Sequence, residues 1–247
     1  MISKVVFTGA SRGLGAEVWQ TFCSLPERPS TALTAGRSPS DDLDYSLGKE
    51  LPLDRSTALV HFAWERGDLS ANSKNIEAIK VLAKSLKNRL IFISTETAGL
   101  RSSIYAEQKY RCESIVTQSG GVVVRIGTTI DAESDAVMRV FRTFHKFGVR
   151  PAVPNSCSLS VTSLNEIARL IERLVHPHGR ALSNRVLTVG AVADFNQLSG
   201  QYSGRFPVPI PIFVPRTAGA VLNLVSGGNS LAADRLTTLS GLLSQKA

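Results

Sequence analysis

The fold is decided by Val5-Val6-Phe7-Thr8-Gly9-Ala10-Ser11-Arg12-Gly13-Leu14-Gly15, a stretch near the start of the sequence. It has the pattern of a buried strand, then a glycine-rich turn, then the first turn of a helix. In such a turn Gly9 lets the chain reverse sharply, Gly13 lets the backbone approach a pyrophosphate, and Gly15 lets the helix pack close to the strand. A phosphate would lie on free N–H groups at the positive end of the helix dipole. The spacing G-x-x-x-G-x-G directly after a strand therefore predicts a dinucleotide site, and the alternative is a glycine-rich loop that holds no ligand.

Short apolar runs alternate with amphipathic stretches along the rest of the sequence. The runs are continuously apolar, which is typical of strands buried on both faces of a parallel sheet. The repetition predicts an α/β fold, a Rossmann-like doubly wound parallel sheet with a small C-terminal substrate lobe. The expected strands are residues 4–8, 31–35, 58–63, 89–94, 121–126 and 185–189, and the expected helices are residues 14–24, 71–86, 105–118, 135–147 and 164–175.

The length of 247 residues fits a single domain, residues 1–247. Residues 1–130 are expected to form a dinucleotide-binding core. Residues 131–247 are expected to complete the sheet and to form a reduced substrate-binding lobe, because prolines accumulate there. The polar segment 38–55 is expected to be loop with one short strand. The most apolar segment, 206–225, is interrupted by prolines and by Arg216, so we expect a packed loop followed by a short helix, with contact to a membrane surface as the alternative.

The composition argues against several classes of protein. Hydrophobic residues make up 43% and charged residues 19% of the chain, which argues against disorder. The net charge is +8, but the basic residues are scattered, so no nucleic-acid partner is expected; a solvated basic surface or attraction of an anionic ligand accounts for the charge. Three widely spaced cysteines argue against a disulfide framework and favour a cytoplasmic location. We find no signal-peptide pattern, no metal-binding cluster and no apolar window of about 18 residues that would span a membrane.

The end of the second expected strand indicates which dinucleotide binds. An NAD site usually has an acidic residue there, which holds the ribose hydroxyls. Here the strand ends in Gly36-Arg37-Ser38, without a carboxylate. Arg37 could pair with a 2′-phosphate, and Arg12 in the glycine turn could reach the same group. We therefore expect NADP(H) rather than NAD(H), unless Arg37 is an ordinary surface arginine.

A tyrosine and a lysine lie four residues apart in Tyr105-Ala106-Glu107-Gln108-Lys109, so on a helix both are on one face. A free tyrosine has a pKa of about 10, so proton exchange near neutrality requires a shift of about two to three units. A lysine ammonium and a positive nicotinamide ring could supply that shift. Alternatively, Tyr105 is a half-buried aromatic residue of an amphipathic helix.

The preceding strand delivers Ser94 and Thr95 at its carboxyl end, where α/β sheets bind ligands. A hydroxyl at this position can hold a substrate oxygen beside Tyr105. We favour Thr95, with Ser94 second; turn or cap chemistry is the alternative for both.

Together these elements resemble the short-chain dehydrogenase/reductase superfamily. The resemblance rests on the glycine turn, on His61-Phe62-Ala63, on Ser94-Thr95, on Tyr105 to Lys109 followed by Glu113, and on Val122-Val123-Val124-Arg125-Ile126-Gly127. It covers roughly the first half of the chain. A weaker similarity, in residues 158–168, is to the extended branch of nucleotide-sugar epimerases, dehydratases and reductases. The resemblance implies a catalytic group of Thr95, Tyr105, Lys109 and Ser94.

Two positions depart from that branch. In its dehydratases the catalytic Thr is followed by Asp and Glu, whereas Glu96 and Thr97 follow Thr95 here, which favours reduction or epimerisation over dehydration. Trp64 replaces the usual small residue after Ala63 and is expected to line the pocket.

The hypothesis is an NADP(H)-dependent sugar ketoreductase or epimerase whose substrate is an anionic sugar derivative, carried on a nucleotide or another phosphate. The alternative is a non-catalytic NADP(H)-binding module that senses redox state, and a homodimer is expected only by analogy. The residues expected to bind the cofactor are Gly9, Ser11, Arg12, Gly13, Leu14, Gly15, Arg37, Phe62, Ala63, Lys109 and Ile126. Those expected to bind substrate are Trp64, Thr95, Glu96 and Tyr105. Arg125, Arg139, Arg142 and Arg150 are either anion contacts or ordinary surface and core-pairing arginines.

Overall fold

The computed structural model describes residues 2–65, 69–101, 103–152, 158–176 and 184–209. Its centre is a sheet of seven parallel strands in the order β10-β6-β5-β4-β1-β2-β3. The strands are β1 (Lys4–Thr8), β2 (Thr31–Gly36), β3 (Leu43–Asp44), β4 (Thr57–His61), β5 (Leu90–Thr95), β6 (Val122–Ile126) and β10 (Val186–Val189). The Rossmann-like α/β fold predicted from the sequence is confirmed, and β3 is the short strand expected within residues 38–55.

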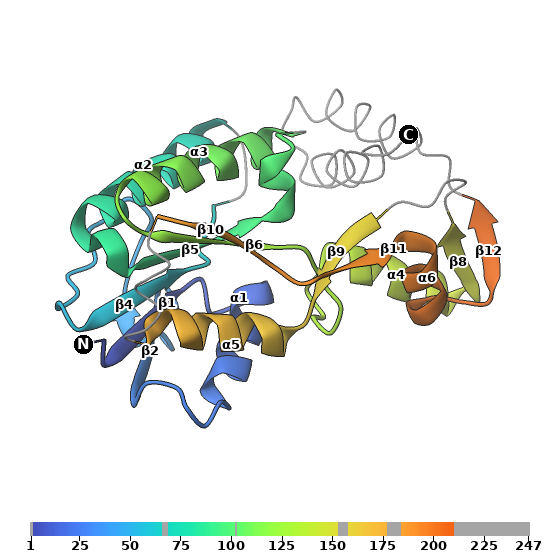
Figure 1. Cartoon of the computed structure of the whole chain (residues 1–247), viewed down its shortest axis with the longest axis horizontal. Coiled ribbons are helices and arrows are strands. Elements are labelled where there is room, and N and C mark those ends of the chain that lie inside the picture. Colours follow the sequence, from blue (N-terminus) through green and yellow to red (C-terminus); the bar gives the residue numbers. More distant parts are fainter. Residues whose placement is uncertain (1, 66–68, 102, 153–157, 177–183, 210–247) are drawn as a thin grey trace.

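Helices cover both faces of this sheet (Figure 1). On one face lie α2 (Leu69–Leu86) and α3 (Ile104–Gln118), and on the other lie α1 (Gly13–Cys23) and α5 (Leu164–Val175). Short 3-10 turns, η1 (Lys87–Arg89) and η2 (Glu96–Gly99), flank β5. Ser163 begins α5 with a capping box, in which Glu166 bonds back to the cap.

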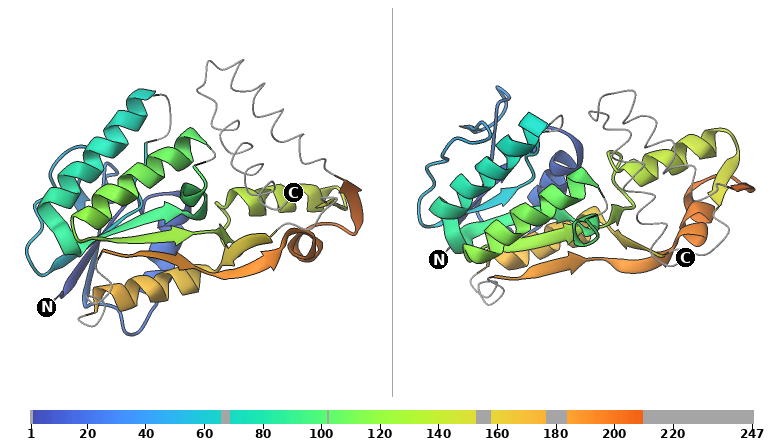
Figure 2. Two further views of the ribbon diagram at one scale, coloured as in Figure 1. Left: turned by 45° about the horizontal axis from the view of Figure 1, so that its top comes forward. Right: turned by 90° about the horizontal axis from the view of Figure 1, so that it is seen from above.

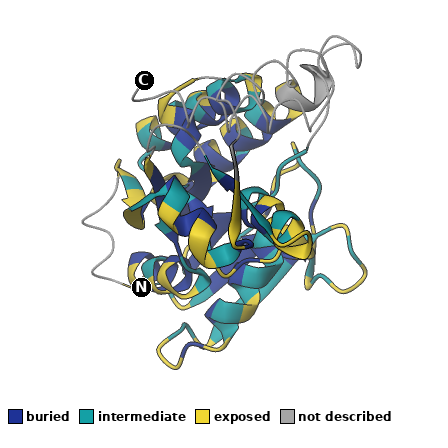
Figure 3. Ribbon diagram, turned by 90° about the vertical axis from the view of Figure 1, so that its right-hand side faces the viewer, coloured by how far each residue is buried: buried dark blue, intermediate teal, exposed yellow. Residues whose placement is uncertain are grey.

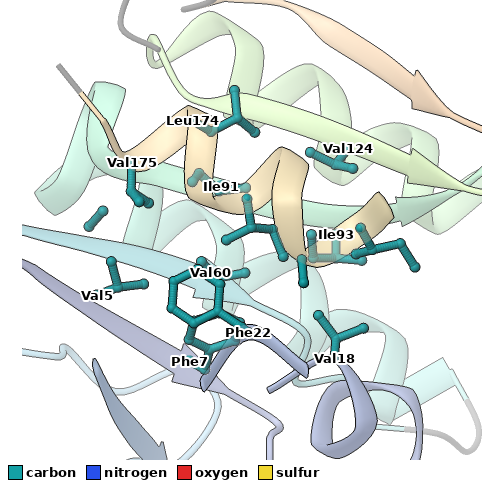
Figure 4. Packing of buried hydrophobic residues seen from close by; sticks show 14 of the residues in the cluster. Val5, Phe7, Val18, Phe22, Val60, Ile91, Ile93, Val124, Leu174 and Val175 are labelled. Carbon is teal, nitrogen blue, oxygen red and sulfur yellow. The ribbon is translucent and has the colours of Figure 1, made fainter. Parts of the chain in front are cut away.

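The core has a layer on each side of the sheet, because alternate residues of a strand point to opposite faces. Phe7, Val60 and Ile91 pack with Phe22 of α1 and Ile171 of α5 in one layer (Figure 4). The other layer joins apolar strand residues to α2 and α3; its largest fully buried members are Leu59, Ile79, Leu82, Leu90 and Phe92.

Beyond β6 the chain builds smaller sheets at the side of the main one (Figures 1 and 2). A three-stranded sheet contains β7 (Thr128–Thr129), β9 (Ser158–Thr162) and β11 (Ala191–Asp194). A two-stranded sheet of β8 (Val149–Ala152) and β12 (Phe206–Pro209) packs with α4 (Ala136–Lys146) and α6 (Phe195–Tyr202). We call α4, β8, α6 and β12 the distal unit.

Two expectations for the C-terminal region meet the structure only in part. The loop expected from residue 206 is wrong for residues 206–209, because these residues pair with β8 as strand β12. The short helix expected later in the segment 206–225 lies outside the described residues.

The helix expected at residues 135–147 is α4, and Asp135 is its N-cap, accepting hydrogen bonds from the backbone N–H groups of Val137 and Met138.

Candidate active site

The glycine turn between β1 and α1 has the geometry that its sequence predicts. Gly9 has a φ of 74° and Gly13 a φ of 64°, in the left-handed region that favours glycine. A Cβ at Gly9 would lie 2.6 Å from the backbone nitrogen of Ala63, and one at Gly15 would overlap the carbonyl oxygen of Gly9. By contrast, nothing lies within 4 Å of the space that a Cβ of Gly13 would take, so the turn is open there. Arg12, the N-cap of α1, makes no side-chain cap bond, which suits an anion at this helix end.

A cavity of about 870 Å³ lies over this turn and the carboxyl ends of the central strands. Its size is within the range of small-molecule and cofactor sites. The structure brings to it every residue expected to bind the cofactor, together with all four expected catalytic residues and Trp64. These are Gly9, Ser11, Arg12, Gly13, Leu14, Gly15, Arg37, Phe62, Ala63, Trp64, Ser94, Thr95, Tyr105, Lys109 and Ile126.

Glu96 is the one predicted site residue that does not line the cavity. It begins η2, which turns away from the strand direction of β5. Its carboxylate accepts hydrogen bonds from the backbone and the side chain of Ser160 in β9, and its burial raises its pKa. Although Glu96 follows Thr95 in the sequence, its side chain points to Ser160 and not into the cavity, so the prediction that it binds substrate is wrong.

Lys109 is buried beneath the cavity, with only 4% of its surface exposed. Its ammonium donates a hydrogen bond of 3.0 Å to the carbonyl oxygen of Ile93. It also lies 4.0 Å from the ring centroid of Trp64, 4.6 Å from that of Phe92 and 5.9 Å from that of Tyr105. Such cation–π contacts stabilise an ammonium that has left water. The positive charge is thus held at a fixed place beside the tyrosine.

Tyr105 lies in the first turn of α3, which begins at Ile104 after the N-cap Ser103. The Tyr105 ring is half-buried and meets the Trp64 ring edge-on, with centroids 5.7 Å apart at 83°. The chain directly after Trp64 is held by Asn75 of α2, whose side-chain amide accepts a hydrogen bond from the N–H of Glu65 (2.8 Å) and donates one to the carbonyl of Glu65 (2.7 Å). The tyrosine and the lysine therefore share one wall of the cavity with Trp64.

The two hydroxyls at the end of β5 have different surroundings. Ser94 is buried and donates a bond of 2.6 Å to Oε1 of Glu113, whereas Thr95 is half-buried and has the Thr97 hydroxyl 3.1 Å away. Glu113 also receives two hydrogen bonds from Arg125, of 2.9 and 2.6 Å. These bonds raise the pKa of Arg125, which is a core-pairing arginine and not an anion contact. Because Ser94 is held in this network, Thr95 is the better placed of the two to hold a substrate oxygen.

The cations at the opposite end of the cavity are Arg12 and Arg37, both exposed. The sequence predicts no carboxylate at the end of β2, but in the structure the carboxylate of Asp41 lies against Gly36, the last residue of that strand. Asp41 folds back because its N–H bonds the carbonyl of Ser38, and its carboxylate accepts the Ser38 N–H at 2.8 Å. It lies against Gly36 but does not line the cavity. A chain reversal within the polar segment brings it there, so no strand pattern could have indicated it.

Sequence reasoning missed several cavity residues that other elements supply, namely Tyr45, Ser46, Leu47, Glu65 and Lys74. Tyr45 follows β3 and is buried, its hydroxyl has no hydrogen-bond partner, and its burial raises its pKa. Lys74 of α2 pairs with Glu65 at 3.0 Å. The short strand β3 was the only sequence signal that pointed to any of them.

His61 ends β4 beneath the cavity and is 1% exposed. Its Nδ1 lies 2.7 Å from the hydroxyl of Thr8, at the end of β1. Burial, and secondarily the charge of Lys109, lower its pKa to about 3. The imidazole is therefore neutral at physiological pH, and it ties together the two strands that carry the glycine turn and the Phe62–Trp64 segment.

Neither a metal cluster nor a transmembrane helix occurs within the described ranges. No three His, Cys, Asp or Glu residues among them are grouped so that they could hold a metal ion. None of the described helices is long and apolar enough to cross a membrane.

The fold and the position of the cavity define a class, the Rossmann-like α/β proteins with a site at the carboxyl ends of parallel strands. No protein-family model matches the sequence, and no curated protein matches it. Solved structures do share the fold. A human epimerase family protein with NADPH superposes with a TM-score of 0.65 at 13% identity, covering 96% of this chain and 93% of that one.

Two bacterial structures are similar to the chain in the same way. A nucleoside-diphosphate-sugar epimerase from Staphylococcus aureus has a TM-score of 0.61 at 13% identity, over 99% of this chain and 92% of that one. The dTDP-glucose 4,6-dehydratase from Bacillus anthracis, in complex with NAD, has a TM-score of 0.63 at 10% identity, over 84% of each chain. At these identities the similarity shows the fold alone, and this is the fold that the resemblance implied.

Proposed function

We propose that the protein is an NADP(H)-dependent oxidoreductase that acts on a carbonyl or hydroxyl group of a sugar carried on a nucleotide or another phosphate. The reaction is ketone reduction or epimerisation. One observation carries the proposal: the open glycine turn, Thr95 of β5, and Tyr105 and Lys109 of α3 all face one cavity, although they come from three separate segments of the chain. The fold shared with sugar epimerases, dehydratases and reductases supports the sugar substrate.

The residues present fit a nicotinamide dinucleotide. The backbone at Gly13 is open and the N-terminus of α1 has no side-chain cap, which suits a pyrophosphate. Arg37 and Arg12 would hold a 2′-phosphate by charge-assisted hydrogen bonds. The cavity lining contains four Lys or Arg residues and one acidic residue, so it favours an anionic ligand. The cofactor, when bound, supplies or accepts the hydride.

The protein's own residues move the proton. The Thr95 hydroxyl and the Tyr105 hydroxyl hold the substrate oxygen between them. In reduction the Tyr105 O–H bond breaks and its proton passes to that oxygen, which leaves a phenolate; in oxidation the phenolate takes the proton back. The Lys109 ammonium, 5.9 Å from the Tyr105 ring, stabilises the phenolate and so favours proton release. The rings of Trp64 and Phe92, which contact the Lys109 ammonium, reduce the access of water to that ammonium.

A non-catalytic NADP(H)-binding module would need the glycine turn and the arginines but not the three proton-handling residues. The convergence of Thr95, Tyr105 and Lys109 on the same cavity therefore favours the enzyme.

The test is Tyr105→Phe, assayed with NADPH and a panel of nucleotide-linked keto sugars. The loss of a general acid should lower turnover about 10²- to 10⁴-fold. Affinity for NADPH should change little, since only the hydroxyl is removed. Tyr110→Phe is the matched control, because Tyr110 lies on the same helix, stacks under Arg101 and does not line the cavity. Full turnover by the Tyr105→Phe protein would refute the proposal.

A further inference from the structure

The distal unit has an unusual distribution of charge. Its segments, residues 136–152 and 195–209, contain no Asp or Glu, but they contain Arg139, Arg142, Lys146, Arg150 and Arg205. Because these segments have five basic residues and no acidic residue, their net charge is +5, whereas that of the whole chain is +8. The nearest acidic residues along the chain are Asp135 and Asp194, which cap the N-termini of α4 and α6.

Both capping carboxylates lie away from the end of the unit where α4 stops. α4 has 11 residues, which places Asp135 about 16 Å from that end. The C-terminal end of α6 also lies there, because Gly204 bonds the carbonyl of Val149. No carboxylate of the unit therefore neutralises the cations at this end.

The same end exposes large apolar side chains. Phe147, the C-cap of α4, is 76% exposed, and Phe206, at the start of β12, is 72% exposed. They are neighbours in space, because the N–H of Phe206 bonds the carbonyl of Gly148 and Phe206 pairs with Val149. Figure 3 looks onto this side of the molecule, with exposed residues in yellow.

Helix α4 extends this surface. Val140, Phe144 and Phe147 recur at i, i+4 and i+7, so they form one stripe, and Val140 is 38% exposed. The stripe is separate from the buried side of the helix, where Met138 and Phe141 pack against α6. A helix with an apolar stripe already buried does not need a second one for its own folding.

Cations flank this second stripe. Arg139 and Lys146 are exposed on α4, and exposed Arg205 directly precedes Phe206. Arg142 and Arg150 are not part of this surface: Arg142 donates hydrogen bonds to the carbonyls of Ala132 and Glu133, and the half-buried Arg150 has its guanidinium against Gly200. Arg139 lies one helical turn from the Asp135 cap, whereas Lys146 and Arg205 lie at the end of the unit to which the unit's own segments bring no carboxylate. Exposed aromatic residues beside such cations match a surface of negatively charged lipid headgroups above an apolar layer.

We propose that this end of the distal unit, formed by Val140, Phe144, Phe147 and Phe206 with Lys146 and Arg205, docks on an anionic membrane surface. The cations contact headgroup phosphates and the phenylalanines enter the boundary with the acyl chains. A nucleic acid is less favoured, because the cations surround one apolar end and do not line an extended groove.

The experiment is co-sedimentation of the full-length chain with vesicles of phosphatidylcholine alone and of phosphatidylcholine mixed with phosphatidylglycerol. Binding should require phosphatidylglycerol and weaken with added salt. The double variant K146E/R205E should lower partition more than about 25-fold, since each cation contributes a factor of about five. F147S/F206S should lower it about tenfold or more.

Matched controls reverse or remove equivalent side chains on other surfaces. K80E/K84E changes two exposed lysines of α2, and Val192→Ser changes a residue of β11 that is 77% exposed. Both should keep wild-type partition. Thermal unfolding checks that each variant is folded, and the single variants Phe147→Ser and Phe206→Ser should each show part of the loss.

Three results would overturn the proposal: no partition of the wild-type chain onto anionic vesicles, partition that the double variants leave unchanged, or binding of a short oligonucleotide that depends on these residues while vesicles are not bound. The assay does not use turnover, so its outcome is independent of the proposed enzymatic function.

Discussion

Acid should unfold this protein through the buried histidine beneath the site. His61 has a pKa of about 3 in the folded chain, because it is enclosed and lies near Lys109, whereas an unfolded histidine has a pKa of about 6.5. Between these values the unfolded chain binds a proton that the folded chain does not. Stability is therefore complete above about pH 6.5 and falls as the pH decreases toward 3.

The size of the effect follows from the proton count. Each pH unit below about 6.5 removes about 1.4 kcal/mol, so His61 alone should lower the free energy of unfolding by about 2 kcal/mol between pH 7 and pH 5. The folded pKa hardly affects this figure, since the folded imidazole is neutral at pH 5 in any case.

The assay is urea unfolding of the wild-type chain and of His61→Asn at pH 7, 6 and 5. Asparagine keeps a polar group beside the Thr8 hydroxyl but takes up no proton, so this variant should lose about 2 kcal/mol less than the wild type over the range. Equal losses for the wild type and His61→Asn would refute the reasoning.

Two further substitutions test the charges around the site. Arg37→Ala should weaken NADPH binding about ten- to a hundredfold and leave NADH binding nearly unchanged, because one charge-assisted contact to the 2′-phosphate is removed; equal affinity of the wild type for both cofactors in calorimetric titration would contradict this. Glu113→Gln should lower the free energy of unfolding by about 3 kcal/mol, since it leaves Arg125 without its buried partner. Glu107→Gln, which breaks an exposed pair with Arg111 on the same helix, should cost under about 1 kcal/mol by the same denaturant titration.

The centre of the main sheet was predictable because β1, β4, β5 and β6 are buried on both faces. Continuous apolar runs such as β4 and β5 are stable only inside a sheet that is covered on both faces, and the glycine turn fixes where the first strand ends. The short strands of the distal unit were not predicted. β8 and β12 have four residues each, and both contain proline, which weakens a strand pattern.

The site was predictable where one local segment carries it, as in the turn from Gly9 to Gly15 or the pair Tyr105 and Lys109. It was not predictable where tertiary contacts decide. Tyr45 and Lys74 reach the cavity because β3 pairs with β2 and because α2 packs against α3 and β5, and no local sequence pattern predicts these contacts. Glu96 shows the opposite case, since its neighbour Thr95 lines the cavity while η2 carries Glu96 to Ser160.

The order of strands in the main sheet has a consequence for how the chain folds during synthesis. β6 is covered on its outer side by β10, yet β10 begins only at Val186, far along the chain from Ile126. At ribosomal speeds of about 5–20 residues per second, the intervening chain takes roughly 3 to 12 s to emerge. During that interval the nascent sheet presents an unsatisfied row of backbone amides and carbonyls in a strand rich in valine, the kind of edge on which chains aggregate. The late arrival of β10 therefore makes this edge a place where a chaperone would be most useful.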